Sequence, residues 1–267
     1  MPARMFSDEE DREVAKSYLA GISQIKISEA YHCTQKVIQG ALKRQNINKR
    51  NVSERNRIYE LDPYVFDCID NEEAAYWWGF LWADGAVLNH RTIALSLKTE
   101  DKLHIYKFRS FLKSTHPIRD EVLKPFEDWQ KQRELSRFYP ADIHLASRLQ
   151  ELGIIKSRPS INPILNYLPR KLENHFIRGV FDGDGSIYKT KRNYPRITIC
   201  GQKELLEWVW GKISENYPEF GKMNVYPHSI IFRLEKVGVL PIQGFLKYIY
   251  HNATIYLERK REISKSC

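Results

Sequence analysis

The sequence lacks a long apolar run and has few cysteines. No window of about 18 residues is apolar throughout, so we expect no transmembrane helix and no membrane partner. The N-terminal segment also lacks the apolar core of a signal peptide, and we therefore expect a cytoplasmic protein. The cysteines form no C-x-x-C pair and the histidines form no H-x-x-x-H pair, which excludes the usual zinc-site spacings.

Acidic residues are fewer than basic ones. The 267 residues contain 33 Asp and Glu against 42 Lys and Arg, which gives a net charge of +9. Such an excess attracts polyanions, of which nucleic acid is the commonest and a membrane surface the second. With a hydrophobic fraction of 42%, the chain has enough apolar residues for the core of one large domain or two smaller ones.

The first 57 residues are predicted to form a small helical module. Helices are expected over 8–19, 24–31 and 35–45, and their apolar spacing resembles a helix-turn-helix, with His32 at the turn position where glycine is usual. The second helix of such a motif lies in the DNA major groove. Its exposed face would present side chains that read base edges and phosphates: Gln35, Lys36, Gln39, Lys43 and Arg44. The alternative is a solvated face of a helical bundle.

After a polar, basic linker that ends near residue 57, the chain is duplicated. Each copy is predicted to have the element order α-β-β-α-β-β-α, with the first copy over 58–165 and the second over 166–267. The strands alternate polar and apolar residues, which indicates sheets with one face under helices and the other open to water or a ligand. The sequence therefore predicts an α+β fold of two pseudo-symmetric halves, preceded by an all-α module.

A short motif begins each copy, with YWWGFLWADGAV at 76–87 and FIRGVFDGDGSI at 176–187. The alignment pairs the small residues of the two motifs in order: Gly79 and Ala83 with Gly179 and Gly183. A spacing of four places each pair on one helix face. Small residues there let two helix backbones approach closely, so we predict that the motif helices pack together, although ordinary tight packing would use the same residues.

Asp84 and Asp184 stand at the C-terminal ends of these helices. A carboxylate is unfavourable at the negative end of the helix dipole, and two converging carboxylates also repel. Divalent cations would relieve both effects, and Mg²⁺ is commonly held by one or two carboxylates with phosphate oxygens and water. The pair therefore suggests metal-dependent phosphodiester hydrolysis. The alternative is that Asp-Gly forms only a turn. A calcium loop that starts at Asp182 is excluded, because Ile187 and Asn193 stand where it needs glycine and an acid.

Together, the two motifs resemble the signature of the LAGLIDADG homing endonuclease family. The segment IRGVFDGDG at 177–185 is a close match, and WWGFLWADG at 77–85 is a looser one, with Trp82 where an acid often stands. The stretches LGIIKS at 152–157 and YLERK at 256–260 are also similar to segments of this family.

The resemblance covers residues 72–262 and implies a monomer with an internal pseudo-dimer, which binds double-stranded DNA of the nucleoid and cuts both strands at a specific site, as in intron homing. It implies that Asp84 and Asp184 bind Mg²⁺ and are catalytic, and that Lys156 and Lys260 neutralise charge near the scissile phosphates. Polar strand residues would contact DNA: Arg91, Thr92, Ser96, Lys98, Ser186, Tyr188, Lys189, Arg192, Arg196, Thr198 and Arg233. Two alternatives stay open: a non-cleaving transcription regulator or RNA maturase on the same fold, and an RNA-binding module that stacks bases on its tyrosines.

Overall fold

A computed structural model describes residues 5–48, 58–124, 132–155, 161 and 164–265. The chain separates into two compact units, residues 1–58 and residues 59–267, which are described one at a time. None of the helices in the described part of the chain has both the length and the apolar character that a membrane span requires.

The N-terminal unit contains the three helices predicted from the sequence: α1 (Asp8–Leu19), α2 (Gln24–Ala30) and α3 (Gln35–Arg44). A capping box starts α1, because the Ser7 hydroxyl accepts from the Glu10 amide while the Glu10 carboxylate accepts from the Ser7 amide. Between α2 and α3, His32 adopts a φ of 44°, the left-handed conformation for which glycine is usual in a turn. The helices enclose a small apolar core of their own: Val14, Tyr18, Ile27, Ile38, Ala41 and Leu42.

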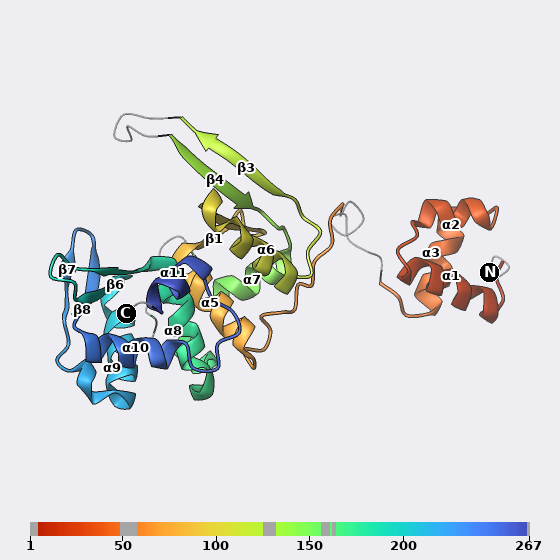
Figure 1. The fold of residues 1–267 in the computed structure, drawn as a ribbon. Coiled ribbons are helices and arrows are strands. Elements are labelled where there is room, and N and C mark those ends of the chain that lie inside the picture. Colours follow the sequence, from red (N-terminus) through yellow and green to blue (C-terminus); the bar gives the residue numbers. More distant parts are fainter. Residues whose placement is uncertain (1–4, 49–57, 125–131, 156–160, 162–163, 266–267) are drawn as a thin grey trace. The chain divides into compact units, whose positions relative to one another are not determined.

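The C-terminal unit confirms the predicted duplication, because its two halves have the same order of elements (Figure 1). The first half consists of α5 (Glu72–Asp84), β1 (Gly85–Leu88), β2 (Thr92–Lys98), the short helix η1 (Thr99–Asp101), α6 (Lys102–Phe111), β3 (Ile118–Leu123), β4 (Arg133–Phe138) and α7 (Ile143–Glu151). Its strands form an antiparallel sheet in the order β1-β2-β4-β3.

The second half consists of α8 (Glu173–Asp184), β5 (Gly185–Lys189), β6 (Pro195–Gly201), α9 (Lys203–Asn216), β7 (Val225–His228), β8 (Ile231–Val237) and α10 (Val239–Ile249), and α11 (Glu258–Ser264) follows it. The sheet order β5-β6-β8-β7 matches that of the first half. Strand β8 continues to Val237, which pairs with Arg196, and Gly238 then turns the chain with a φ of 118° before α10 begins.

Helices α5 and α8 form the centre of the C-terminal unit, where they pack against each other between the two sheets (Figure 1). Every residue of α5 from Ala74 to Trp82 is buried, so this helix has no polar face toward water. A helix that is apolar on all sides belongs inside a protein. The large side chains of α5 and α8 therefore make up the middle of a core that both halves share: Tyr76, Trp77, Trp78, Phe80, Phe176 and Phe181.

Candidate functional site

The two motif helices touch through their backbones. A Cβ atom on Gly79 would lie 2.1 Å from the carbonyl oxygen of Phe176, and one on Gly179 would lie 2.1 Å from the carbonyl oxygen of Tyr76. Both distances are far below van der Waals contact, so only glycine fits at either position. The reciprocal contacts, 79 with 176 and 76 with 179, are related by a pseudo-two-fold axis. Further along, Gly183 meets Ala83, so the two helices run parallel.

The contact continues to the ends of the helices. A Cβ atom on Gly183 would lie 2.3 Å from the Cβ atom of Ala83. The structure therefore places all four small residues of the two motifs at the helix contact: Gly79, Ala83, Gly179 and Gly183. Because the helices are parallel and in contact up to this point, their C-terminal residues lie side by side.

Asp84 and Asp184 are those C-terminal residues. Both side chains are exposed, and the Asp84 carboxylate lies 3.5 Å from the position of a Cβ atom on Gly183, the residue before Asp184. The protein around Asp84 removes much of its water and raises the pKa of its carboxyl, although the charge of Lys260 acts in the opposite direction. Two acids thus meet at the negative ends of two helix dipoles.

The residues present at this point fit a divalent cation. Asp84 and Asp184 supply carboxylate oxygens, the ligand type that Mg²⁺ prefers. Within the described residues, no cluster of three or more His, Cys, Asp or Glu side chains is arranged to hold a metal. A cation between these two acids would therefore take its other ligands from water and from phosphate oxygens, as Mg²⁺ often does.

Lys260 does not have the position that the resemblance implied. Its ammonium is buried and donates to the carbonyl oxygens of Phe181, Asp182 and Gly183 at 2.7, 2.6 and 3.2 Å. An ammonium has three N–H donors, so all are used by the last carbonyls of α8. Burial lowers the pKa of Lys260 to about 8, against the opposing charges of Asp182 and Asp84. Lys260 thus caps a helix end, whereas Lys156 lies outside the described residues.

Asp182 is a buried acid that the sequence reasoning missed. Its Oδ2 atom accepts hydrogen bonds from the Tyr76 hydroxyl at 2.8 Å and from the Leu257 amide at 2.7 Å. Burial raises the pKa of Asp182 to about 6, although Lys260 lowers it. The sequence feature that could have indicated this burial is the position of Asp182 in the motif, two residues before Asp184 and on the opposite side of the helix.

The Tyr76 hydroxyl also lies 2.8 Å from Nε2 of His104 on α6. Because this hydroxyl donates its proton to Asp182, it accepts from the N–H of His104. Burial lowers the pKa of His104 to about 3, so the ring is neutral with its proton on Nε2. The three side chains thus form a continuous buried hydrogen-bond chain from the first half of the unit to the second.

Arg178 and Glu72 form a second buried connection between the halves. Arg178 is fully buried, its Nη2 atom lies 2.6 Å from Glu72 Oε1, and its Nε donates to the Ile255 carbonyl at 2.8 Å. Glu72 also accepts from the amide and the hydroxyl of Thr254 at 2.7 and 2.8 Å. Burial acts to raise the pKa of Glu72, but the bonds from Thr254 and Ile255 and the charge of Arg178 outweigh it and lower that pKa.

Residues 253–264, called here the C-terminal strap, follow α10 and cross to the first half. Lys107 on α6 donates to the Tyr256 carbonyl at 3.0 Å and pairs with Glu258 at 2.8 Å. Arg259 pairs with Asp101 in η1 at 3.0 Å. The strap is therefore attached to both halves, and Lys260 within it reaches the end of α8.

The fold is shared with a solved structure. No family model and no curated protein matches the chain. The chain is similar to the homing endonuclease I-WcaI bound to its DNA recognition sequence, at 12% identity and a TM-score of 0.54, over 72% of this chain and 87% of that one. This chain has the LAGLIDADG fold. It is also similar to full-length DUF199/WhiA from Thermatoga maritima, at 16% identity and a TM-score of 0.47, over 76% of this chain. The chain spans 64% of the length of that protein.

In the second sheet of the LAGLIDADG unit, the strand register gathers most of the polar residues named from the sequence on one face. Ser186 pairs with Thr198, Tyr188 with Arg196, and Cys200 with Arg233. Thr198 is buried, however, and its hydroxyl lies 2.6 Å from that of Ser186, so it supports Ser186 and is not open to a ligand.

Two further residues named from the sequence, Lys189 and Arg192, lie where β5 ends and the chain turns to β6. Lys189 pairs with Pro195 and so alternates away from Tyr188, but at the end of β5 it lines the same hollow as Tyr188 and Arg196. Arg192 is exposed in the turn between β5 and β6. Arg196 lies over the Tyr188 ring at 5.9 Å and pairs with Glu235 at 3.5 Å, which orients its guanidinium on the polar face.

The first sheet has a polar face on the side opposite the buried Ile93, Leu95 and Leu97. It carries Thr92, Ser96 and Lys98 on β2, and Arg91 precedes this strand. The register adds Arg137, opposite Ser96, and Arg119, opposite Arg137, both of which the sequence reasoning missed.

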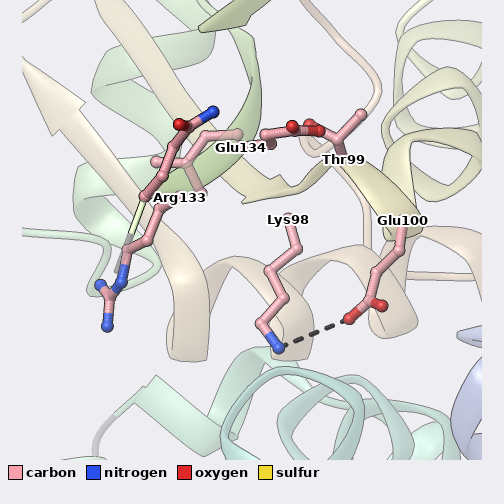
Figure 2. Close-up of a pocket in the computed structure, with 7 residues that line it drawn as sticks. Lys98, Thr99, Glu100, Arg133 and Glu134 are labelled. Atoms are coloured by element: carbon pink, nitrogen blue, oxygen red, sulfur yellow. Dashed lines mark ion pairs between the residues drawn. The ribbon is translucent and has the colours of Figure 1, made fainter. Parts of the chain in front are cut away.

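Lys98 lies in a hollow at the end of this face. Figure 2 shows it beside Glu100, Arg133 and Glu134, and its Nζ atom is 3.4 Å from a Glu100 carboxylate oxygen. Arg137 pairs with Glu121 at 2.7 Å. The basic side chains of the first sheet are thus partly neutralised by acids, which the sequence alone did not indicate.

In the N-terminal unit, α3 presents a shallow hollow lined by Lys36, Gln39 and Lys43. Gln35 is exposed at the start of the same helix. Arg44 is exposed as expected, but it does not line this hollow. Its Nε and Nη2 atoms donate to the buried carboxylate of Asp11 at 2.6 and 2.7 Å, which ties α3 to α1.

Proposed function

We propose that this chain is a metal-dependent, site-specific DNA endonuclease of the homing type that acts as a monomer. The observation that supports this most directly is the meeting of Asp84 and Asp184 at the ends of two parallel helices in backbone contact. A homodimer would obtain such a pair by symmetry, whereas here both acids come from one chain. The intron-homing role expected from the sequence belongs to the same proposal.

In the proposed reaction, Asp84 and Asp184 would hold Mg²⁺. When bound, the metal would supply a more acidic water and stabilise the leaving oxygen of phosphodiester hydrolysis. The chain's own part is to position the two carboxylates, because the backbone contact at Gly79 and Gly179 brings the two helix ends together. The ammonium of Lys260 binds the last carbonyls of α8 and so offsets the negative end of the helix dipole beside Asp184.

DNA would lie along the polar faces of the two sheets. The second sheet offers Tyr188, Arg196 and Arg233, and the first offers Ser96 and Lys98. Arginine and amide or hydroxyl side chains are the types that contact base edges and phosphates. The net charge of +9 favours the same partner.

The N-terminal unit would add a second DNA contact. Gln35, Lys36, Gln39 and Lys43 project from α3, the helix that a helix-turn-helix inserts in the major groove. A helix of this kind carries its own base contacts, so we expect a target longer than the sheets alone would cover.

The test is cleavage of a randomised DNA library in Mg²⁺, with sequencing of the ends produced. Wild type should produce one preferred cut, whereas Asp84→Asn and Asp184→Asn should leave the DNA intact and still retain it on a filter. Asp70→Asn is the matched control, because it changes an exposed acid just before the opposite end of α5. Cleavage by either active-site variant at the wild-type rate would exclude the catalytic assignment.

A second candidate is a DNA-binding regulator, or an RNA maturase, that uses the same fold without cutting. It is favoured by Lys260, whose ammonium donates to backbone carbonyls of α8 and not outward to a phosphate. Tight, site-selective binding by wild type with no new ends at any Mg²⁺ concentration would select this candidate over the nuclease.

A further inference from the structure

The C-terminal strap is fixed at Asp182, a residue that the proposed chemistry does not use. One oxygen of this carboxylate accepts from the Leu257 amide of the strap and from the Tyr76 hydroxyl of the first half. Asp182 is 2% exposed and Tyr76 is fully buried, so no water competes for either bond. A charge-assisted bond in such surroundings holds its partners firmly.

The first half contributes more than the single hydroxyl. His104 on α6 donates to Tyr76, and its neighbour on the same helix, Lys107, binds Tyr256 and Glu258 of the strap. The position of the strap therefore depends on the helices of both halves, α5 and α6 in the first and α8 in the second.

The strap in turn holds the last turn of α8 in place. Lys260 stands three residues after Leu257, and its ammonium binds the carbonyls of the three residues that precede Asp184. A shift of Leu257 would move Lys260 and release these carbonyls, of which that of Phe181 would keep one bond, from the Gly185 amide. The last turn of α8, with Asp184 at its end, would then loosen.

We propose that Tyr76 and Asp182 are positioning residues, which fix the C-terminal strap and, through Lys260, hold Asp184 in place for cleavage. Under this proposal a hydroxyl in the first half controls the acid of the second. The inference rests on the proposed nuclease function for its kinetic readout, but the positioning itself is a property of the folded protein.

The first-half motif lacks the acid to which the strap is fixed. The alignment that pairs Gly79 with Gly179 also pairs Tyr76 with Phe176 and Trp82 with Asp182. Tyr76→Phe therefore installs the residue that the other motif helix already carries, at the same depth and with almost the same volume. This makes it a mild variant with which to test the proposal.

The experiment compares Tyr76→Phe with Ser136→Ala, which removes a different buried hydroxyl that donates to a carboxylate, Asp120, at 2.7 Å. Tyr76→Phe should slow single-turnover cleavage on the order of 10-fold without changing the Kd for DNA, because the acid is misplaced and the DNA surface is intact. Ser136→Ala should cleave at the wild-type rate. In a Lys260→Met background, Tyr76→Phe should cause no further slowing.

Wild-type cleavage by Tyr76→Phe, or rate losses that multiply in the double variant, would overturn the proposal. Hydrogen–deuterium exchange of the strap gives a readout that needs no cleavage. Exchange across residues 253–264, including the Leu257 amide, should be faster in Tyr76→Phe and unchanged in Ser136→Ala. If wild type makes no cut, the proposed nuclease function is wrong, but the exchange measurement still tests the positioning role of Tyr76. Unchanged exchange in Tyr76→Phe would overturn that role.

Discussion

The two halves of the LAGLIDADG unit share one topology but anchor their motif helices in different ways. In the first half, the Trp78 indole donates to the Leu152 carbonyl at 2.9 Å, and Trp82 packs against Gly153. A Cβ atom on Gly153 would lie 2.5 Å from the Trp82 ring. In the second half, the equivalent residues are Arg178 and Asp182, which bind the segment after α10 by ionic hydrogen bonds.

This difference shows that one helix position can be satisfied by apolar packing or by a buried polar network. The network is not a more stable choice in general, because desolvation of the charges offsets their attraction. The network instead links distant segments, since Arg178 and Asp182 connect α8 to the C-terminal strap, which also contacts the first half. Trp82, which stands where the second motif has an acid, packs against Gly153 within the first half.

The largest effect is expected from a substitution at the backbone contact between α5 and α8, which the two halves share. Gly179→Val places side-chain atoms where a Cβ atom already lies 2.1 Å from a backbone oxygen of α5, so we expect loss of cooperative folding. Gly211→Ala on α9 is the matched control, because a Cβ there meets no atom within 4 Å; it should stabilise the protein by about 0.5–1 kcal/mol. Thermal unfolding measures both, and a folded Gly179→Val protein with the wild-type Tm would contradict the tight helix contact.

The next prediction compares the stability cost of removing the polar anchor, Arg178, with that of removing the Trp78 hydrogen bond. Arg178→Met leaves the half-buried Glu72 without its cation and should cost about 3 kcal/mol of unfolding free energy. Trp78→Phe leaves one carbonyl acceptor unsatisfied and should cost roughly 1–3 kcal/mol. Urea denaturation gives both values. An equal or larger cost for Trp78→Phe would show that the polar network is not the more critical of the two anchors.

A smaller effect concerns pH and tests the acid that the second motif has where the first has Trp82. Burial raises the pKa of Asp182 from 3.8 to about 6, so the unfolded chain loses this proton first as the pH rises. Wild-type stability should therefore fall through this window by up to about 3 kcal/mol from this group. Asp182→Asn should lack the fall, so its stability relative to wild type should be higher at pH 7 than at pH 4. The same difference at both pH values would contradict the raised pKa.

The sequence predicted the architecture well, for physical reasons that are local. The repeated motif, the four-residue spacing of Gly79 with Ala83 and of Gly179 with Gly183, and the strand alternation each depend on residues that are close in the chain. These patterns are enough to place both acids at helix ends and to predict two equivalent sheets. They also predicted the three N-terminal helices, whose caps and apolar faces are local features.

The missed contacts are those of residues whose surroundings come from distant parts of the chain. Lys260 was assigned to the DNA backbone, but it binds carbonyls 77–79 positions earlier in the sequence. Arg44 was assigned to a DNA-reading face, but its partner is the buried Asp11. The role of Asp182 depends on Tyr76 and Leu257, which no local pattern joins to it.

We propose that Asp84 and Asp184 form one shared site and not two separate ones. This can be measured as cleavage of the mapped target with each strand labelled in turn, by Asp84→Asn and by Asp184→Asn, at saturating protein. We expect that each variant binds the target and that neither cuts either strand, because each acid is needed for both cuts. If one variant still cut one strand at the wild-type rate, the two acids would act independently and the shared site would be contradicted.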